Sequence, residues 1–202
     1  MREPRPERPY HHGDLRQAII ATALETMRAE RNWQFTLREI ARRAGVSHAA
    51  PYKHFADKGA LLAALATIGF EHLRSDLIQA QSGAGEEPSK GLRPMALAYV
   101  DFAIDNPALY RLMFGAESSD QRDVHLTENA IGLFETVMDV LDRGQSEGAF
   151  RQRPVRDLAT ACWALLHGIA MLQIDGLLQP EKVGLEPLEA AFRTLMEGIS
   201  SV

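Results

Sequence analysis

The chain has 202 residues, of which 46% are hydrophobic and 24% charged, which is typical of a soluble globular protein. Its single cysteine, Cys162, excludes an internal disulfide framework and a cysteine-rich zinc site. The formal net charge is −5, but residues 1–81 carry a balance of +3 and residues 82–202 a balance of −8. The phosphate backbone of a DNA duplex would attract the first part and repel the second.

The N-terminal segment is basic and rich in proline. It contains Arg2, Arg5 and Arg8 and lacks the apolar run of a signal peptide. No later stretch approaches the ~20 uninterrupted apolar residues of a membrane span. A lone cysteine suits a reducing compartment, so the sequence predicts a cytoplasmic protein. We expect residues 1–12 to form a flexible arm whose Arg5 and Arg8 can enter a DNA minor groove.

Hydrophobic periodicity predicts helices along almost the whole chain, with no alternating β pattern and no hairpin turn. The predicted fold class is therefore all-α, with about nine helices. They are expected near residues 14–31, 36–45, 47–55, 57–81, 92–105, 108–114, 120–147, 154–178 and 185–199.

Residues 36–55 have the pattern of a helix-turn-helix. Thr36 and Glu39 form a capping box at the start of the first helix. Gly45 suits the turn, since glycine adopts positive φ at little cost, and Ser47 is predicted to cap the second helix. That second helix is narrow enough to enter a major groove. Pro51 removes one backbone hydrogen bond about one turn in, so we expect the helix to be tightened or bent there.

The side chains of this segment indicate how a duplex would be contacted. His48 is the best candidate for reading a base edge, while Ala49 and Ala50 can touch a thymine methyl group. Tyr52 can reach a phosphate, and Lys53 either a phosphate or a guanine. Amides at the two helix N-termini also favour anions. The residues expected to bind DNA are Arg5, Arg8, Thr36, Ser47, His48, Ala49, Ala50, Tyr52, Lys53 and Lys58.

The same residues resemble the DNA-binding domain of the TetR family of bacterial regulators. That family typically has Tyr-x-x-Phe near the end of the recognition helix, matched here by Tyr52 to Phe55, and then a lysine, matched by Lys58. The C-terminal part resembles a subgroup with Trp-x-x-x-His-Gly, matched by Trp163 to Gly168. The resemblance implies a dimeric repressor that a small molecule releases from a palindromic operator.

The last two predicted helices point to a dimer. Residues 185–199 carry a coiled-coil-like seam, and the helix over 154–178 is apolar on more than one side, so two surfaces must cover it. A partner chain would complete a four-helix bundle, although an intramolecular core is the alternative. The expected interface residues are Leu158, Cys162, Leu165, Ile169, Leu185, Leu188, Phe192, Leu195 and Ile199.

Large apolar residues predicted to face inward are the candidates for a ligand pocket. They are Tyr99, Phe102, Tyr110, Met113, Phe114, Phe134, Met138, Trp163, His167 and Met171. His167 is either a ligand contact or a buried histidine bonded to a neighbour. Trp163 fills either the core or the pocket.

No nucleophile–base set, phosphate-binding glycine loop or metal quartet is present, so the chain is not expected to be an enzyme or to bind a metal or cofactor. The predicted regions are an arm at 1–12, a DNA-binding domain at 13–56, a connecting helix at 57–81, and a sensing and dimerisation domain at 82–202. The alternatives are an architectural DNA-binding protein without a ligand, and a helical metabolite-binding protein or enzyme.

Overall fold

The computed structural model describes residues 12–83, 88–115 and 124–200, so the arm with Arg5 and Arg8 lies outside the described residues. The described part is all-α, as predicted, apart from one isolated bridge between Phe150 and Ser200. Its elements are α1 (His12–Glu30), α2 (Leu37–Arg43), the 3-10 helix η1 (Pro51–Lys53), α3 (Lys58–Ser82), α4 (Pro88–Asp105), α5 (Pro107–Phe114), α7 (Glu128–Ser146), α8 (Val155–Ile174), α9 (Pro180–Val183) and α10 (Pro187–Ile199).

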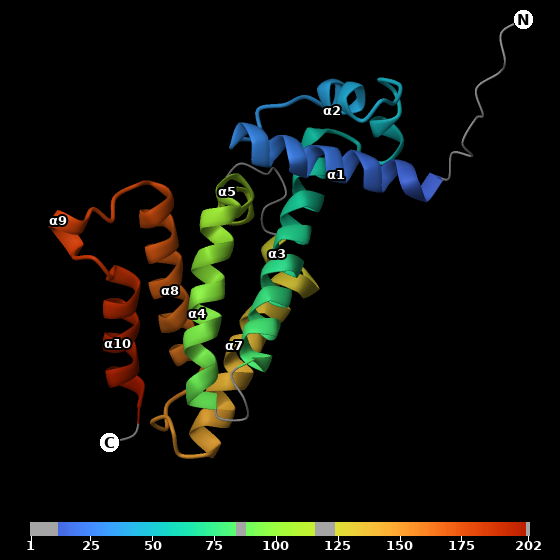
Figure 1. The fold of residues 1–202 in the computed structure, drawn as a ribbon. Helices are drawn as coiled ribbons and strands as arrows, with labels where there is room; N and C mark the ends of the chain where they lie inside the picture. The colour runs from blue at the N-terminus through green and yellow to red at the C-terminus, as the bar shows by residue number, and fades with distance from the viewer. Residues whose placement is uncertain (1–11, 84–87, 116–123, 201–202) are drawn as a thin grey trace, which may run out of the picture.

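The molecule has two parts joined by a long helix (Figure 1). α1, α2 and η1 form a small unit at one end, which we call the reader. α3 leaves the reader and packs lengthwise against α4 and α7, and α8 and α10 complete the bundle. α3 and α7 run away from the reader, whereas α4 and α8 run towards it.

α3 is held by its cap and by one apolar stripe. The carboxylate of Asp57 accepts a hydrogen bond from the Ala60 amide at 2.8 Å, which satisfies a donor at the start of the helix. Leu61, Leu65 and Leu73 recur at helical spacing and are fully buried. A single hydrophobic core therefore runs from the reader into the bundle.

α5 lies between the reader and the bundle and packs against α1, α3 and α4. Its approach to α3 is close because position 69 is glycine. A Cβ atom there would lie 2.5 Å from the Sδ atom of Met113. Sequence reasoning located α5 correctly but did not indicate this contact.

Several helix boundaries differ from the expected ones, and α4 begins at Pro88 instead of residue 92. The helix expected from residue 120 begins as α7 at Glu128, where Thr127 supplies the cap. The helix expected to reach residue 178 ends at Ile174, and Gly176 then turns the chain with φ of 67°. Leu185 precedes α10, which begins at Pro187, so it belongs to the connection and not to the helical seam.

Candidate nucleic-acid interface and ligand cavity

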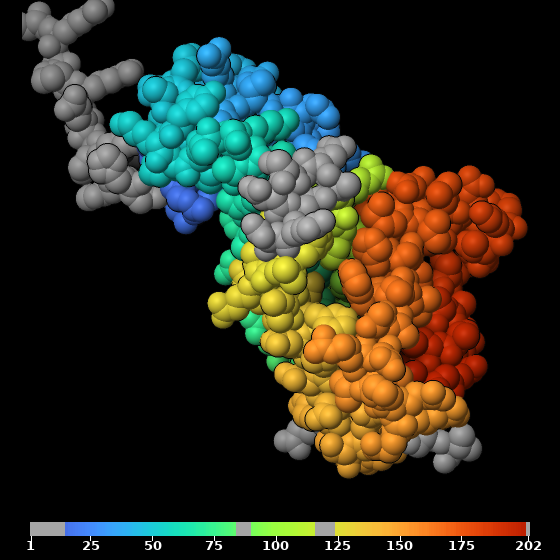
Figure 2. Space-filling model, turned by 180° about the vertical axis from the view of Figure 1, so that it is seen from behind, coloured from blue at the N-terminus to red at the C-terminus, as the bar shows by residue number. Residues whose placement is uncertain are grey.

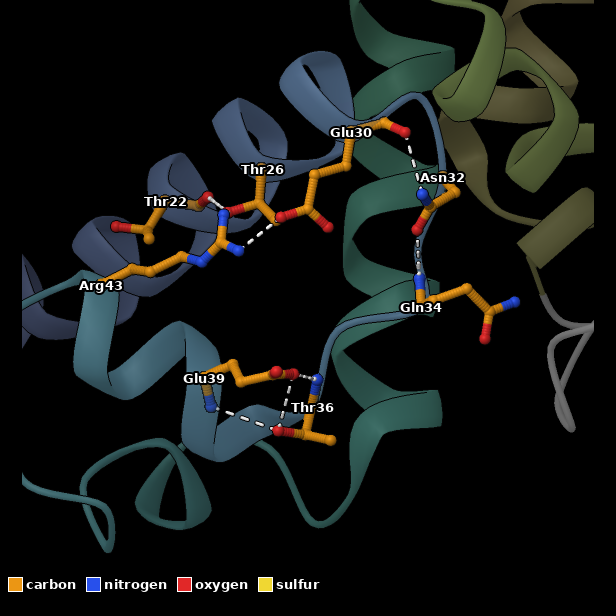
Figure 3. Close-up of polar contacts among 8 residues, drawn as sticks. All are labelled: Thr22, Thr26, Glu30, Asn32, Gln34, Thr36, Glu39 and Arg43. Carbon is orange, nitrogen blue, oxygen red and sulfur yellow. Dashed lines mark hydrogen bonds and ion pairs between the residues drawn. The ribbon is translucent and has the colours of Figure 1, made fainter.

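The start of α2 has the predicted capping box. The Thr36 hydroxyl accepts a hydrogen bond from the Glu39 amide at 3.2 Å, and the Glu39 carboxylate accepts one from the Thr36 amide at 2.6 Å (Figure 3). The bond from the Thr36 amide is the main reason that the pKa of Glu39 is lowered. The Thr36 amide is therefore occupied by a carboxylate, which weakens the expectation that it binds a phosphate.

The second half of the helix-turn-helix differs from the prediction. Gly45 turns the chain with φ of 70°, but residues 48–50 form turns and only Pro51–Lys53 is a 3-10 helix. Ser47 makes no side-chain cap. Instead, its carbonyl accepts a hydrogen bond from the Ala50 amide at 2.9 Å. Pro51 explains the change, because it has no amide hydrogen to continue an α-helix from Ser47.

This recognition segment exposes most of the side chains expected to face DNA. Ser47, His48, Ala49 and Lys53 are exposed, and Tyr52 is 51% exposed. Ala50 is the exception. Its side chain is buried in the reader core, so it is not available to a thymine methyl group, as had been expected.

Lys58, the first residue of α3, is half-buried. Its Nζ atom lies 5.5 Å from the centre of the Phe35 ring, a cation–π distance. The ring holds the ammonium group close to the reader core, so reaching a phosphate requires the side chain to leave it.

Of the two adjacent arginines on α2, one is tied to α1. Arg43 forms an ion pair with Glu30, and its other terminal nitrogen donates to the Thr26 hydroxyl at 3.4 Å (Figure 3). This contact fixes α2 on α1. Arg42 is exposed and is therefore the better placed of the two arginines to contact the DNA backbone.

The bundle encloses a cavity of about 360 Å³ between α3, α4, α7, α8 and α10. Its walls are mostly apolar, although Glu135 and Arg156 also line it. It lies in the size range of small-molecule sites, which are about 300–1,000 Å³ and largely apolar. Five of the ten expected pocket residues line it: Tyr99, Phe114, Phe134, Met138 and Trp163.

The other five expected pocket residues lie outside the cavity wall: Phe102, Tyr110, Met113, His167 and Met171. Two of them support the wall. The Tyr110 hydroxyl lies 2.9 Å from the Tyr99 hydroxyl and 2.8 Å from Nδ1 of His167. His167 is thus the histidine bonded to a neighbour, which was one of the two readings left open.

Burial keeps this hydrogen-bonded chain uncharged. It raises the pKa of Tyr99 to about 12 and raises that of Tyr110 as well, while it lowers the pKa of His167. Each hydroxyl can both donate and accept, so the two hydrogen bonds can form with either tautomer of the neutral imidazole.

Trp163 lies at the opening of the cavity and is 43% exposed. Ile131 of α7 and Glu135, one turn later, also line the cavity and are exposed to solvent. Figure 2 shows this side of the molecule, with α7 in yellow beside α8 in orange and the surface hollowed between them. The opening between α7 and α8 gives a ligand a route inward.

Several lining residues were not anticipated. Phe70 and Leu77 come from α3, which had been assigned only a connecting role. Their helical spacing places them on its buried face, so this signal was present in the sequence. Arg156 and Cys162 also line the cavity, and burial raises the pKa of the Cys162 thiol to about 11.

Comparisons with known proteins agree with this architecture. Residues 19–65 match the family model "Bacterial regulatory proteins, tetR family", and residues 92–199 match "Tetracyclin repressor-like, C-terminal domain". This chain belongs to the TetR family. The predicted helix-turn-helix regulator is thereby confirmed, whereas the Trp-x-x-x-His-Gly subgroup stays a prediction.

Individual relatives support the same assignment. The chain is 34% identical to a Rhodococcus protein of unknown function, covering 96% of this chain and 100% of that one, with a TM-score of 0.81. It is 25% identical to YobS of Bacillus subtilis, an uncharacterized HTH-type transcriptional regulator, over 93% of both chains. The flavonoid-responsive regulator FrrA shares the fold, with 21% identity, a TM-score of 0.62, and coverage of 93% and 98%.

In this TetR-family chain, the residues expected at a dimer interface differ in how far they are buried. Leu158, Cys162, Ile169 and Ile199 are buried within one protomer, because their side chains face its own core. This corrects their assignment to a partner surface. Phe192 and Leu195 line the cavity, and Leu165 and Leu188 are half-buried, while Leu185 is 87% exposed.

A different face of α8 and α10 is open and made of small residues. On α8, Ala161 and Ala164 are exposed, and a Cβ added at Gly168 would meet no heavy atom within 4 Å. On α10, Ala190 and Thr194 are exposed and share a shallow groove with Ala161. We call this the small-residue face. Helices can approach one another closely across such a surface.

No group of three or more His, Cys, Asp or Glu side chains could hold a metal ion within residues 12–83, 88–115 and 124–200. In the same ranges, α8 alone is long and apolar enough to cross a membrane by length and composition, a weak criterion that core helices also meet. Its exposed apolar surface includes the small-residue face.

Proposed function

We propose that this TetR-family regulator is a homodimeric repressor whose reader binds a palindromic operator and is released when a small molecule enters the cavity. The observation that carries the proposal is the apolar cavity of about 360 Å³ directly behind α5. An architectural DNA-binding protein has no need of such a cavity. The flavonoid-responsive relative FrrA favours the same interpretation.

α5 is placed to carry the signal from the cavity to the reader. Phe114, at its C-terminal end, lines the cavity, and Tyr110 bonds to the cavity residue Tyr99. At the other end, Asn106 accepts a hydrogen bond from Arg28 of α1 at 3.4 Å. A ligand that moves Phe114 therefore acts on α1 through one short helix. The ligand must bind the released state more tightly than the DNA-binding state to shift the equilibrium between them.

The small-residue face is the proposed dimer interface. Two copies that pack there about a two-fold axis would form a four-helix bundle from α8 and α10. The two readers could then bind successive major grooves of one duplex. The groove is lined by Ala161, Leu165, Ala190, Ala191, Thr194 and Leu195.

Ala164→Glu tests the dimer, because two-fold symmetry brings two carboxylates into the apolar interface. We expect a monomer in sedimentation experiments and DNA affinity reduced at least tenfold, since one reader must then bind alone. The matched control is Gln79→Glu, which adds the same charge at an exposed position of α3. A dimeric Ala164→Glu variant with unchanged affinity would refute this interface.

Ala96→Phe tests the cavity. Ala96 lines it and is 3% exposed, so a larger side chain projects into the space that the ligand needs. We expect normal DNA binding, which shows that the variant folds, together with loss of release by any effector that acts on the wild type. Unimpaired release would show that the effector binds elsewhere.

A further inference from the structure

The cavity is a long slot. On α8 its lining residues run from Arg156 to Leu166, which is about 15 Å of helix at ~1.5 Å per residue. On α4 they run from Leu92 to Tyr99, or about 10 Å. A volume of about 360 Å³ spread over this length leaves a narrow cross-section. The shape suits one elongated molecule better than a compact one.

The two ends of the slot differ in chemistry. α3 and α7 run away from the reader while α4 and α8 run towards it, so the lining residues can be placed at either end. The end near the reader, which we call the aromatic end, contains Phe70, Tyr99, Phe114, Phe134 and Trp163. The far end contains mainly aliphatic side chains together with Phe192 of α10 and Arg156, and we call it the Arg156 end.

The aromatic end is built to hold a ring. Phe70 and Phe114 meet edge-to-face with centroids 5.3 Å apart, and Phe134 and Trp163 do so at 6.5 Å. Aromatic rings prefer such offset or edge-on neighbours. The hydroxyl of Tyr99 is already bonded to Tyr110, and the one basic lining residue at this end among the described residues is His125, whose ring meets Phe70 edge-to-face at 5.7 Å.

Arg156 supplies a positive charge at the opposite end. Within the described residues its guanidinium takes part in no ion pair, unlike those of Arg93, which pairs with Glu189, and Arg111, which pairs with Asp175. It precedes Trp163 by seven residues, or about 10 Å along α8.

The other charged lining residue, Glu135, follows Phe134, whose ring contacts Trp163. A negative charge beside the aromatic end disfavours a ligand carboxylate there. Both charges therefore direct an anionic group toward Arg156, which can bind a carboxylate through two parallel hydrogen bonds.

We propose that the cavity binds an elongated arylalkyl carboxylate, with its ring at the aromatic end and its carboxylate paired with Arg156. This assignment rests on the proposed effector role of the same cavity. The ring would lie against Phe114, the cavity residue on α5, and the carboxylate would remain near solvent, where its desolvation costs little.

Titration of the full-length protein with phenylacetate, phenylbutyrate, phenylhexanoate and phenyloctanoate tests the proposal by calorimetry and by the fluorescence of Trp163. Affinity should rise with chain length until the ring and the carboxylate span the slot. Arg156→Gln should weaken binding of the best acid by about tenfold, as expected for loss of a charge-assisted pair. It should leave binding of the methyl ester unchanged.

Arg153→Gln is the matched control, because Arg153 is an exposed arginine that does not line the cavity. Equal binding of acid and ester, insensitive to Arg156→Gln, would overturn the anion assignment. Straight-chain acids that bind as tightly as aryl acids would overturn the ring assignment.

DNA binding is measured separately in the same samples. Acid binding that depends on Arg156 but leaves DNA affinity unchanged would support the ligand assignment and refute release by the cavity. Release of DNA by neutral ligands alone would support release through the cavity and refute the carboxylate assignment.

Discussion

The hydroxyl of Tyr110 lies 2.8 Å from Nδ1 of His167 and joins α5 to α8. The same hydroxyl lies 2.9 Å from the hydroxyl of Tyr99, so one oxygen connects three helices of the bundle. Tyr110 has no exposed surface, and removal of its hydroxyl takes a hydrogen-bond partner from the buried Tyr99 and from the half-buried His167.

Tyr110→Phe should therefore lower the free energy of unfolding by about 1–3 kcal/mol, the usual cost of an unsatisfied buried polar group. Urea denaturation measures it. Tyr52→Phe serves as the control, since Tyr52 is 51% exposed on the recognition segment and should affect DNA affinity without affecting stability. Equal stability of both variants would show that the buried chain contributes nothing.

His167 makes the stability depend on pH. Burial lowers its pKa in the folded protein, so the unfolded chain takes up a proton first as the pH falls. The contribution of the neutral histidine is complete above its unfolded pKa of about 6.5 and is lost as the pH falls below that value. Denaturation at pH 7.5 and at pH 5.5 should show a larger loss for the wild type than for His167→Phe. An equal loss would mean that His167 is not the titrating group.

Lys53 should add affinity for any duplex. It is exposed on the recognition segment, so Lys53→Gln removes one phosphate contact and should reduce the slope of log affinity against log salt by about one. Fluorescence anisotropy at several salt concentrations measures that slope. Lys182→Gln on α9 is the control and should leave it unchanged. An unchanged slope for Lys53→Gln, with lost discrimination between sequences, would indicate that Lys53 reads a guanine instead.

The capping box of α2 should make a measurable contribution to the free energy of unfolding. Thr36→Ala removes the hydroxyl that accepts from the Glu39 amide, which should lower the free energy of unfolding by about 1 kcal/mol. Thr160→Ala, which removes an exposed hydroxyl bonded to its own helix, should change it little. Circular dichroism during thermal unfolding compares the two, and a larger effect at Thr160 would contradict the capping argument.

Gly144 should tolerate no side chain. A Cβ atom there would lie 2.1 Å from Cδ2 of Phe150, which is 1% exposed, so Gly144→Ala must displace a buried ring at a cost of about 1–3 kcal/mol. Gly83→Ala is the control, because its added Cβ would meet only ordinary contacts of 3.7 and 3.9 Å. Both variants can be compared by urea denaturation. Equal stabilities would mean that Phe150 moves freely.

Local patterns predicted the all-α fold, the capping box and the turn at Gly45, because each depends on residues close in sequence. The helix expected over 47–55 is shorter than predicted, because turns precede a 3-10 helix at Pro51–Lys53, but the tightening expected at Pro51 is present. The cavity was only half predicted. Periodicity identifies a buried face but not the height at which residues of different helices meet, so Tyr110 and His167 were placed in the wall that they support.

The dimer residues show the same limit. The row containing Leu158, Cys162 and Ile169 is apolar and was assigned to a partner, yet the protomer's own core covers it. Ala161, Ala164 and Gly168 are less hydrophobic and were not predicted to lie at the interface, although they are on the open side of α8. Hydrophobicity alone does not distinguish a core face from a face that two copies can share.

We propose above all that this chain reads DNA as a two-fold dimer. Selection from a pool of random duplexes at two salt concentrations, followed by sequencing of the retained DNA, tests this most directly. We expect an inverted repeat with half-sites about 34–36 Å apart and affinity that falls as salt rises. Retention of duplexes that share no sequence, or of single unpaired half-sites, would contradict it.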